Sequence, residues 1–311
     1  MRVLVTGGAG FVGANLTRHL LTRGHEVTVL DDLSTGYRSN LNGVDATLHV
    51  GSILDTDVLD PLVAAADSVV HLAARGSVPR SLADPARTNL VNVTGTLNVL
   101  QAARARSTHV LVASSSSVYG ANPALPKRED QVAMPVSPYA VSKLATESYT
   151  VAFARSYGLD TLPFRFFNIY GPLQSARHDY AAVIPCFFSA LLDDAPLTVH
   201  GDGRQSRDFT SISSVVAVLT DAVERRVTHT GPVNLAFGTN TDLLTLIDQM
   251  QDLTGRTAKV EHTPTRTGDV RASLADNTVL RSLFPDAAPQ PLGDGLAATL
   301  AWFRETDARQ S

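Results

Sequence analysis

A chain of 311 residues that is 44% hydrophobic and 18% charged can bury a large core in one big domain or two coupled ones. Its net charge of −4 and scattered lysines and arginines argue against nucleic acid as a partner, and no apolar run approaches the ~18 residues of a membrane span. We therefore expect a soluble, cytoplasmic protein that binds neither nucleic acid nor membranes. The single cysteine, Cys186, excludes an internal disulfide and a multi-cysteine metal site, so we expect no bound metal.

Short runs rich in β-branched residues alternate with helical patterns through the first half of the chain. The first run, RVLVTGG, leads into apolar positions at helical spacing over residues 11–23, with Gly24 as the stop. Further helices are predicted over 86–105 and after Ser137, which can cap a helix that runs from Pro138 to Gly158. This alternation indicates a parallel sheet covered on both faces. After about residue 171 the pattern loosens, which predicts a smaller second lobe.

The segment VTGGAGFVG joins the first strand to the first helix and carries glycines at 7, 8, 10 and 13. Glycine lets the backbone turn sharply there and approach a pyrophosphate, while the helix N-terminus supplies unpaired N–H donors. The second strand, EVTVLDD, ends at Asp31 and Asp32, and a carboxylate at this place binds ribose hydroxyls and repels a 2′-phosphate. The first half is therefore predicted to be a Rossmann-type domain that binds NAD in preference to NADP.

A tyrosine and a lysine follow in PYAVSK. Tyr139 and Lys143 are four residues apart on the predicted helix, so their side chains share one face. A run of four serines, 114–117, precedes them at the end of a strand. A tyrosine and a lysine at this spacing are common in proteins. Following a Rossmann-type first half and a run of serines, they make the resemblance to a particular family specific.

Together these residues resemble the extended short-chain dehydrogenase/reductase family, and within it the NAD-dependent nucleotide-sugar epimerases and dehydratases. The resemblance extends over nearly the whole chain through TGGAGFVG, DDLSTG, HLAARGSVPRS, NVTGTLNVL, SSSSVYG, SPYAVSK, FRFFNIYGP, YAAVIP, GDGRQSRDF and RTGDV, in that order. It implies an α/β fold, with a Rossmann-type doubly wound parallel sheet over 1–170 and a smaller C-terminal α/β substrate-binding lobe over 171–311. Some later segments are expected to return to the first domain.

The resemblance also implies the chemistry. It places the catalytic hydroxyl at Ser115, four positions before the tyrosine of VYG, between Tyr139 and the 4-hydroxyl of a UDP-sugar. Tyr139 as a phenolate base needs its pKa lowered by about three units, worth about 4 kcal/mol, and Lys143 and the nicotinamide ring of NAD would favour the anion. Related dehydratases carry Asp-Glu, and related decarboxylases a Glu, at the two positions that are Ser116 and Ser117 here. Without an acid there, epimerisation at C4 through a 4-keto sugar is favoured over elimination.

Two sets of binding residues follow from the same resemblance. Those implied to bind NAD are Gly7, Gly10, Phe11, Val12, Gly13, Asp31, Asp32, Ser34, Thr35, Gly36, Ser52, Ile53, Leu72, Ala73, Ala74, Tyr139, Lys143 and Phe166. Those implied to bind the UDP-sugar are Ser77, Ser115, Ser116, Ser117, Tyr139, Asn168, Ala182, Val183, Arg207, Arg266 and Asp269. His71 lies inside a predicted strand, so we expect a hydrogen-bonded structural histidine.

Several points stay open at this stage. The sequence does not choose among UDP-glucose, UDP-N-acetylglucosamine and UDP-glucuronate. Arg75, Arg177 and His178 could bring positive charge toward C6 of the sugar, although solvated loop charges are favoured for Arg177 and His178. The alternatives are a nucleotide-sugar decarboxylase or dehydratase on the same scaffold and a non-catalytic dinucleotide sensor. The resemblance also implies a homodimer that pairs through the helices near 86–105 and 138–157.

Overall fold

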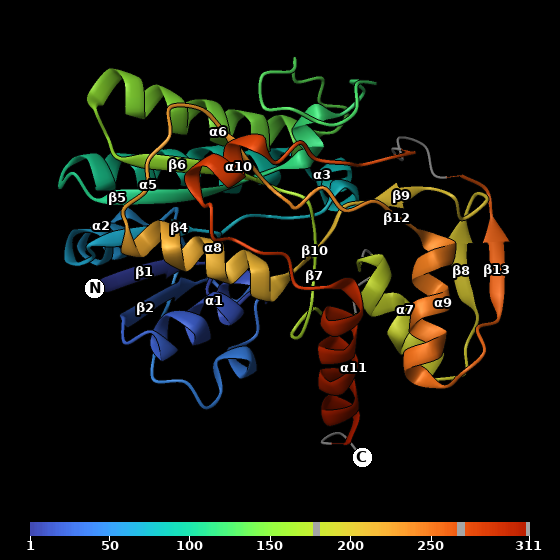
Figure 1. Ribbon diagram of the computed structural model, residues 1–311. Coiled ribbons are helices and arrows are strands. Elements are labelled where there is room, and N and C mark those ends of the chain that lie inside the picture. The colour runs from blue at the N-terminus through green and yellow to red at the C-terminus, as the bar shows by residue number, and fades with distance from the viewer. Residues whose placement is uncertain (177–180, 266–270, 309–311) are drawn as a thin grey trace.

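The protein is described by a computed structural model that covers residues 1–176, 181–265 and 271–308. Figure 1 shows a larger lobe built around a sheet and, beside it, a smaller lobe near the C-terminus. Across the described ranges, no helix is both long and apolar enough to cross a membrane.

The larger lobe is organised by a seven-stranded sheet in which every neighbouring pair of strands is parallel. In spatial order its strands are β3 (Thr47–Val50), β2 (Glu26–Asp31), β1 (Arg2–Thr6), β4 (Ser68–His71), β5 (His109–Ser115), β6 (Thr161–Phe166) and β11 (Val233–Leu235). The order reverses between β1 and β4, so their carboxyl ends diverge and leave a crevice, the usual place for a ligand in such sheets. The predicted doubly wound Rossmann-type sheet is confirmed.

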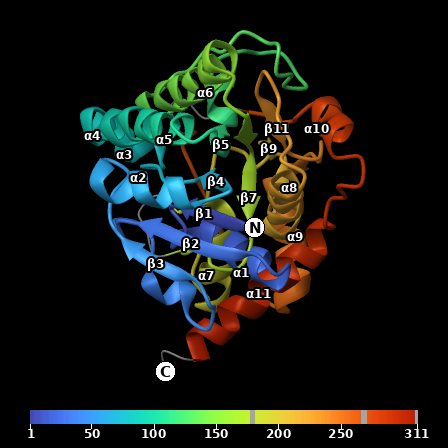
Figure 2. The same ribbon diagram turned by 90° about the vertical axis from the view of Figure 1, so that its left-hand side faces the viewer.

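Helices cover both faces of this sheet, as the turned view in Figure 2 shows. One face carries α1 (Phe11–Thr22), α8 (Ile212–Glu224) and α10 (Thr278–Leu283), and the other carries α2 (Thr56–Ala65), α5 (Gly95–Arg104) and α6 (Pro138–Tyr157). Each layer is sealed by its own apolar cluster, with Val5, Leu16 and Leu219 in the first and Leu4, Leu100 and Phe153 in the second. The strand β11 and helix α8 come from late in the chain and pack on the first half.

The smaller lobe has a separate apolar core that includes Phe188, Met250 and Phe303. Its elements are α7 (Val183–Leu192), β8 (Leu197–His200), β9 (Ser206–Arg207), β12 (Thr241–Asp242), α9 (Leu243–Thr254), β13 (Val260–Thr263) and α11 (Leu292–Ala308). Between the lobes run β7 (Asn168–Tyr170) and β10 (Phe209–Ser211), which pair in parallel. The chain therefore crosses from one core to the other next to Asn168 and Arg207.

The helices agree with the sequence prediction except at one place. Helix α6 begins behind Ser137, whose Oγ accepts from the Ala140 N–H at 3.2 Å, and ends at Gly158 in the left-handed conformation with φ of 67°. The helical run predicted over 86–105 is present but interrupted: α4 (Pro85–Asn89) continues into a π-helical turn, η2 (Leu90–Thr94), and then into α5. A short helix that was not predicted, α3 (Val78–Ala83), precedes it. Turns such as η2 often mark functional positions, and this one carries Asn92. Two 3₁₀ turns, η1 (Arg38–Leu41) and η3 (Ser116–Tyr119), complete the set.

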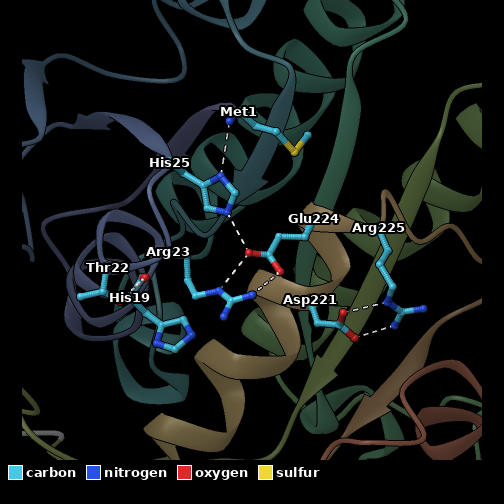
Figure 3. A network of polar contacts seen from close by, with 8 residues as sticks. All are labelled: Met1, His19, Thr22, Arg23, His25, Asp221, Glu224 and Arg225. Atoms are coloured by element: carbon cyan, nitrogen blue, oxygen red, sulfur yellow. Dashed lines mark hydrogen bonds and ion pairs between the residues drawn. The ribbon is translucent and has the colours of Figure 1, made fainter.

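Polar side chains tie α8 to the edge where the first strands begin (Figure 3). Glu224, at the end of α8, accepts from Arg23 Nε at 3.0 Å and lies 3.1 Å from His25 Nε2, while Met1 lies beside the other ring nitrogen of His25. Exposed pairs of this kind add little stability. They join the last residue of α8 to the segment between α1 and β2.

Candidate active site

A first cavity of about 560 Å³ opens at the carboxyl ends of β1, β2 and β4. The residues predicted to bind NAD that line this cavity are Gly7, Gly10, Phe11, Val12, Gly13, Asp31, Asp32, Ser34, Thr35, Ser52, Ile53, Leu72, Ala73 and Ala74. Gly36 is not part of the lining; a Cβ there would lie 2.8 Å from the carbonyl carbon of Ala9, so it serves close backbone packing. Sequence reasoning missed further lining residues, among them Gly51, Gly76, Arg80, Arg87 and Val91.

The glycines bring two backbone segments into direct contact at the floor of this cavity. Gly7 has φ of 72°, and a Cβ on it would lie 2.7 Å from Ala73 N. A Cβ on Gly13 would lie 2.3 Å from the carbonyl oxygen of Gly7. Side chains are therefore kept away from the N-terminus of α1, which leaves its N–H groups open to a diphosphate.

Asp31 and Asp32 play different parts at the end of β2. The Asp31 carboxylate accepts from the Ala9 N–H at 2.9 Å and from the Leu33 N–H at 2.8 Å. Burial raises the pKa of Asp31, and these hydrogen bonds oppose that rise. Asp32 is exposed and accepts from Ser34 Oγ at 2.6 Å. Both Asp31 oxygens keep a further lone pair with which they could accept from a ribose hydroxyl, and together with the open helix end they make a cavity that fits NAD.

A second cavity of about 930 Å³ lies between the two lobes. It shares the wall formed by Phe11, Val12, Leu72, Ala74, Gly76 and Ser77 with the first cavity. From the predicted residues it is lined by Ser77, Ser115, Tyr139, Lys143, Phe166, Asn168, Ala182, Val183 and Arg207. Within the described ranges its lining contains no Asp or Glu. Missed lining residues include Pro79, Phe167, Gln174, Thr198, His200 and Gln205. Pro79, Phe167 and Gln205 stand within the motifs HLAARGSVPRS, FRFFNIYGP and GDGRQSRDF, which could have pointed to them.

Tyr139, Lys143 and Ser115 line the second cavity together, and none of the three lines the first. Lys143 is buried and donates from Nζ to the Ala113 carbonyl at 2.8 Å, and burial lowers its pKa to about 8. Burial also raises the pKa of Tyr139, while a hydrogen bond with Ser115 lowers it. The chain itself therefore leaves Tyr139 mainly protonated at neutral pH, so a phenolate base requires a positive charge brought by a bound group.

The four serines have four different environments. Ser114 is buried and donates to Glu147 Oε2 at 2.9 Å, and Ser115 faces the second cavity. Ser116 and Ser117, expected to touch substrate, do not line this cavity, because the chain turns there into the 3₁₀ helix η3. Ser117 lies behind Ser115 and bonds to it, with its N–H 3.2 Å and its Oγ 2.9 Å from Ser115 Oγ.

Behind the tyrosine and lysine lies a buried ion pair that the sequence analysis missed. Glu147 is bonded to Arg165 on β6 at two points, 2.6 and 2.9 Å, and both side chains are almost fully buried. Glu147 follows Lys143 by four residues, so Tyr139, Lys143 and Glu147 form one stripe along α6. That spacing is the signal that could have revealed Glu147.

His71 and Asn92 form a second buried polar group. The His71 ring lies 2.7 Å from Thr6 Oγ1 and 3.0 Å from Thr96 Oγ1, and burial lowers its pKa to about 3. The ring is therefore neutral and bonded on both sides, which agrees with a structural histidine. Asn92, in the π-helical turn, accepts from the Arg75 N–H at 2.7 Å and donates to Ser142 Oγ at 2.9 Å. It thereby joins the wall between the cavities to α6.

The remaining predicted side chains fall in two groups. Arg75 lines the first cavity, not the second, and forms an ion pair with Asp84 at 3.0 Å, so its charge is directed toward the start of α4. Arg177, His178, Arg266 and Asp269 lie outside the described residues. Among the described residues no group of three or more His, Cys, Asp or Glu side chains is placed to hold a metal.

Comparison with known proteins identifies the family and the fold. The model of the NAD dependent epimerase/dehydratase family matches residues 3–236. The UDP-glucose 4-epimerase of Mycolicibacterium smegmatis is 37% identical, over 98% of this chain and 99% of that protein. The UDP-N-acetylglucosamine 4-epimerase of Methanobrevibacter ruminantium, solved with UDP-N-acetylmuramic acid, superposes with a TM-score of 0.94 at 35% identity, covering 98% of both chains. A UDP-N-acetyl-alpha-D-glucosaminuronate decarboxylase of Bacillus cytotoxicus is 32% identical over 98% of each. The chain therefore belongs to the NAD-dependent epimerase/dehydratase family.

Proposed function

We propose that the protein is an NAD-dependent UDP-sugar 4-epimerase, acting on a UDP-hexose such as UDP-glucose, UDP-N-acetylglucosamine or UDP-glucuronate. One observation carries the proposal: Ser115, Tyr139 and Lys143 line a cavity that shares a wall with the first cavity, and the described lining of this second cavity has no carboxylate. The first cavity suits NAD and the second suits a nucleotide sugar. Relatives with this activity match essentially the whole chain.

The reaction follows from what each side chain can do. Tyr139 takes the proton of the sugar's 4-hydroxyl, and its own hydroxyl later returns a proton to the same oxygen. NAD bound in the first cavity would supply a reversible hydride acceptor for C4, so no other oxidant would be needed. Lys143 adds positive charge that favours the tyrosine anion. Inversion results when the 4-keto sugar presents its other face before the hydride returns.

The second cavity is suited to holding the diphosphate while the sugar turns. Arg207 and Asn168 line it near the lobe crossing, and a guanidinium matches phosphate oxygens in a two-point geometry. The side facing the sugar is largely apolar and small, including Pro79, Ala182 and Val183. Such a surface offers few hydrogen bonds that would fix a single sugar orientation.

The alternative reactions lack a group that they require. Elimination of water needs a general acid and base near C5 and C6, and the positions implied for it, 116 and 117, carry serines that turn away from the cavity. The decarboxylase likeness shows that the scaffold supports other chemistry, so product identity is the decisive readout. A non-catalytic sensor would have no use for a buried lysine beside a cavity tyrosine.

We also propose that two copies pair through α6 and the neighbouring helical segments. Leu90, Val141 and Tyr149 are 40%, 52% and 39% exposed, which is high for large apolar side chains on adjacent helical segments. A Val141→Glu variant should run as a monomer in light scattering while the parent runs as a dimer. A monomeric parent would refute the pairing.

Purified protein incubated with a panel of UDP-hexoses, with products separated chromatographically, tests the proposed function. We expect interconversion of C4 epimers of at least one pair without net reduction of NAD. Carbon dioxide from UDP-glucuronate, or a dehydrated product from UDP-glucose, would show that the protein is one of the alternatives.

A further inference from the structure

The oxygen of Ser115 is hydrogen-bonded from behind by its neighbour. Both the N–H and the hydroxyl of Ser117 donate to it, at 3.2 and 2.9 Å. A serine hydroxyl has two acceptor lone pairs and one proton. With both lone pairs engaged, the hydrogen-bonding capacity that Ser115 keeps for the second cavity is the donation of its single proton.

We propose that Ser117 is a positioning residue that fixes Ser115 as a hydrogen-bond donor to the Tyr139 oxygen. This rests on the proposed function, in which Tyr139 is the base, and it changes the part of Ser115. A relay through Ser115 would need its oxygen to accept the proton of the sugar hydroxyl, and the structure has that oxygen occupied. The O–H bond of the sugar's 4-hydroxyl then breaks directly to Tyr139, where the new O–H bond forms, and Ser115 stabilises the tyrosine anion without exchanging its own proton.

A second serine pair in the same chain shows that the arrangement around Ser115 is particular. Ser211 caps α8 and accepts from the Ser213 N–H at 3.3 Å, with the two hydroxyl oxygens 3.0 Å apart. There the Ser213 hydroxyl donates to Gln290 Oε1 at 2.6 Å, and the Ser211 hydroxyl donates to the same oxygen. The two serine pairs share a backbone motif, but in the second pair both hydroxyl protons are donated to a third residue, Gln290. Neither serine lines the second cavity, which makes this pair an internal control.

The charged groups around Tyr139 come from several elements. Lys143 lies one turn along α6, with the Glu147–Arg165 ion pair behind it, and neutral His71 on β4 is close enough to Lys143 to be affected by its charge. From the smaller lobe, His200 and Arg207 line the same cavity. Ser117 carries no charge, so its removal changes the titration of Tyr139 only through Ser115. A hydroxyl that receives a hydrogen bond is also a stronger donor.

The test compares Ser117→Ala with Ser117→Thr, which keeps the hydroxyl, in the NAD-loaded enzyme. We expect Ser117→Ala to lower kcat about 3- to 10-fold at pH values below the titration of Tyr139, with recovery at high pH. The phenolate absorbance titration, measured without substrate and corrected with Tyr139→Phe, should move to higher pH by several tenths of a unit to about one unit. Ser117→Thr should match the parent.

Two controls separate positioning from a structural effect. Ser213→Ala removes the equivalent serine of the other cap and should leave both the rate and the phenolate titration unchanged. In a Ser115→Ala background, Ser117→Ala should add nothing, because Ser117 acts through Ser115. A loss that is equal at all pH values, or that persists in the Ser115→Ala background, would overturn the proposal. A parent inactive on every UDP-hexose would refute the proposed function instead, while the substrate-free phenolate titration would still decide the part of Ser117.

Discussion

The two cavities are built in different ways. The first is shaped by main chain: Gly7 and Gly13 leave no room for a Cβ, and the ends of β1, β2 and β4 define its floor. The second is shaped by side chains that come from both lobes, and Arg207 sits on β9, a strand of only two residues. On the proposed function, the cofactor would contact a backbone geometry fixed by the sheet, whereas the nucleotide sugar would contact individual side chains that can be replaced one at a time. A substitution in the first cavity should therefore impair NAD binding, and a substitution in the second should separately impair UDP-sugar binding.

The largest effect on turnover is expected from a substitution of Tyr139. Tyr139→Phe removes the proton acceptor but keeps the ring, so kcat should fall by about 10²- to 10⁴-fold, the usual worth of general acid–base catalysis. Equilibrium binding of NAD and of the UDP-sugar should change little. Steady-state kinetics with calorimetric binding checks this, and a variant that kept full turnover would remove Tyr139 from the mechanism.

A single added methyl group should disrupt NAD binding in the first cavity. Gly13→Ala places a Cβ 2.3 Å from the Gly7 oxygen and 2.6 Å from Gly8 Cα, both main-chain atoms that cannot swing aside. Overpacking of this kind costs about 3 kcal/mol, so NAD affinity should fall about 100-fold. The bound NAD of the purified protein is the readout. Gly293→Ala is the matched control, because apart from its chain neighbours and its own helix backbone no atom lies within 4 Å of the added Cβ. Equal NAD loss in both variants would contradict a backbone-built cavity.

The second cavity should be weakened without touching the first. Arg207→Met should raise KM for the UDP-sugar about 10- to 100-fold with kcat and NAD content nearly unchanged, since diphosphate contacts serve ground and transition states alike. Arg204→Met, an exposed neighbour that does not line the cavity, is the control. A fall in kcat at constant KM would show that Arg207 does not act as a diphosphate anchor.

The smallest effect concerns the pH dependence of stability. His71 has a folded pKa of about 3 against an ordinary value of 6.5, so below pH 6.5 the unfolded chain binds a proton that the folded chain does not. The free energy of unfolding should therefore decrease as pH falls, with about 2 kcal/mol of the change between pH 7 and pH 5 due to this residue. Urea unfolding of the parent and of His71→Asn at both pH values measures it. An equal pH dependence in the two proteins would mean that His71 titrates normally.

Local signals explain what the sequence could predict. The bounds of α6 follow from Ser137, Pro138 and Gly158, and the glycine turn follows from its spacing, because each depends on residues close in the chain. The helical run predicted over 86–105 is present, but its π-helical turn has no local signal in the sequence. Asn92, in that turn, bonds to Arg75 and Ser142, which are distant in sequence. The Glu147–Arg165 pair likewise arises only once β6 and α6 are packed together. The bond from Ser117 to Ser115 is local, but it depends on the turn into η3, which the serine run alone does not specify.

The central claim, transient oxidation at C4 with return of the same hydrogen, is tested most directly with a UDP-hexose that carries deuterium at C4. The substrate is the one that the panel identifies, and the label is located in the product by NMR after conversion in ordinary water. We predict that deuterium is found at C4 of the inverted sugar, because the hydrogen leaves and returns within one closed site. Loss of the label to solvent, its transfer to another carbon, or a product without the inverted C4 would contradict the account.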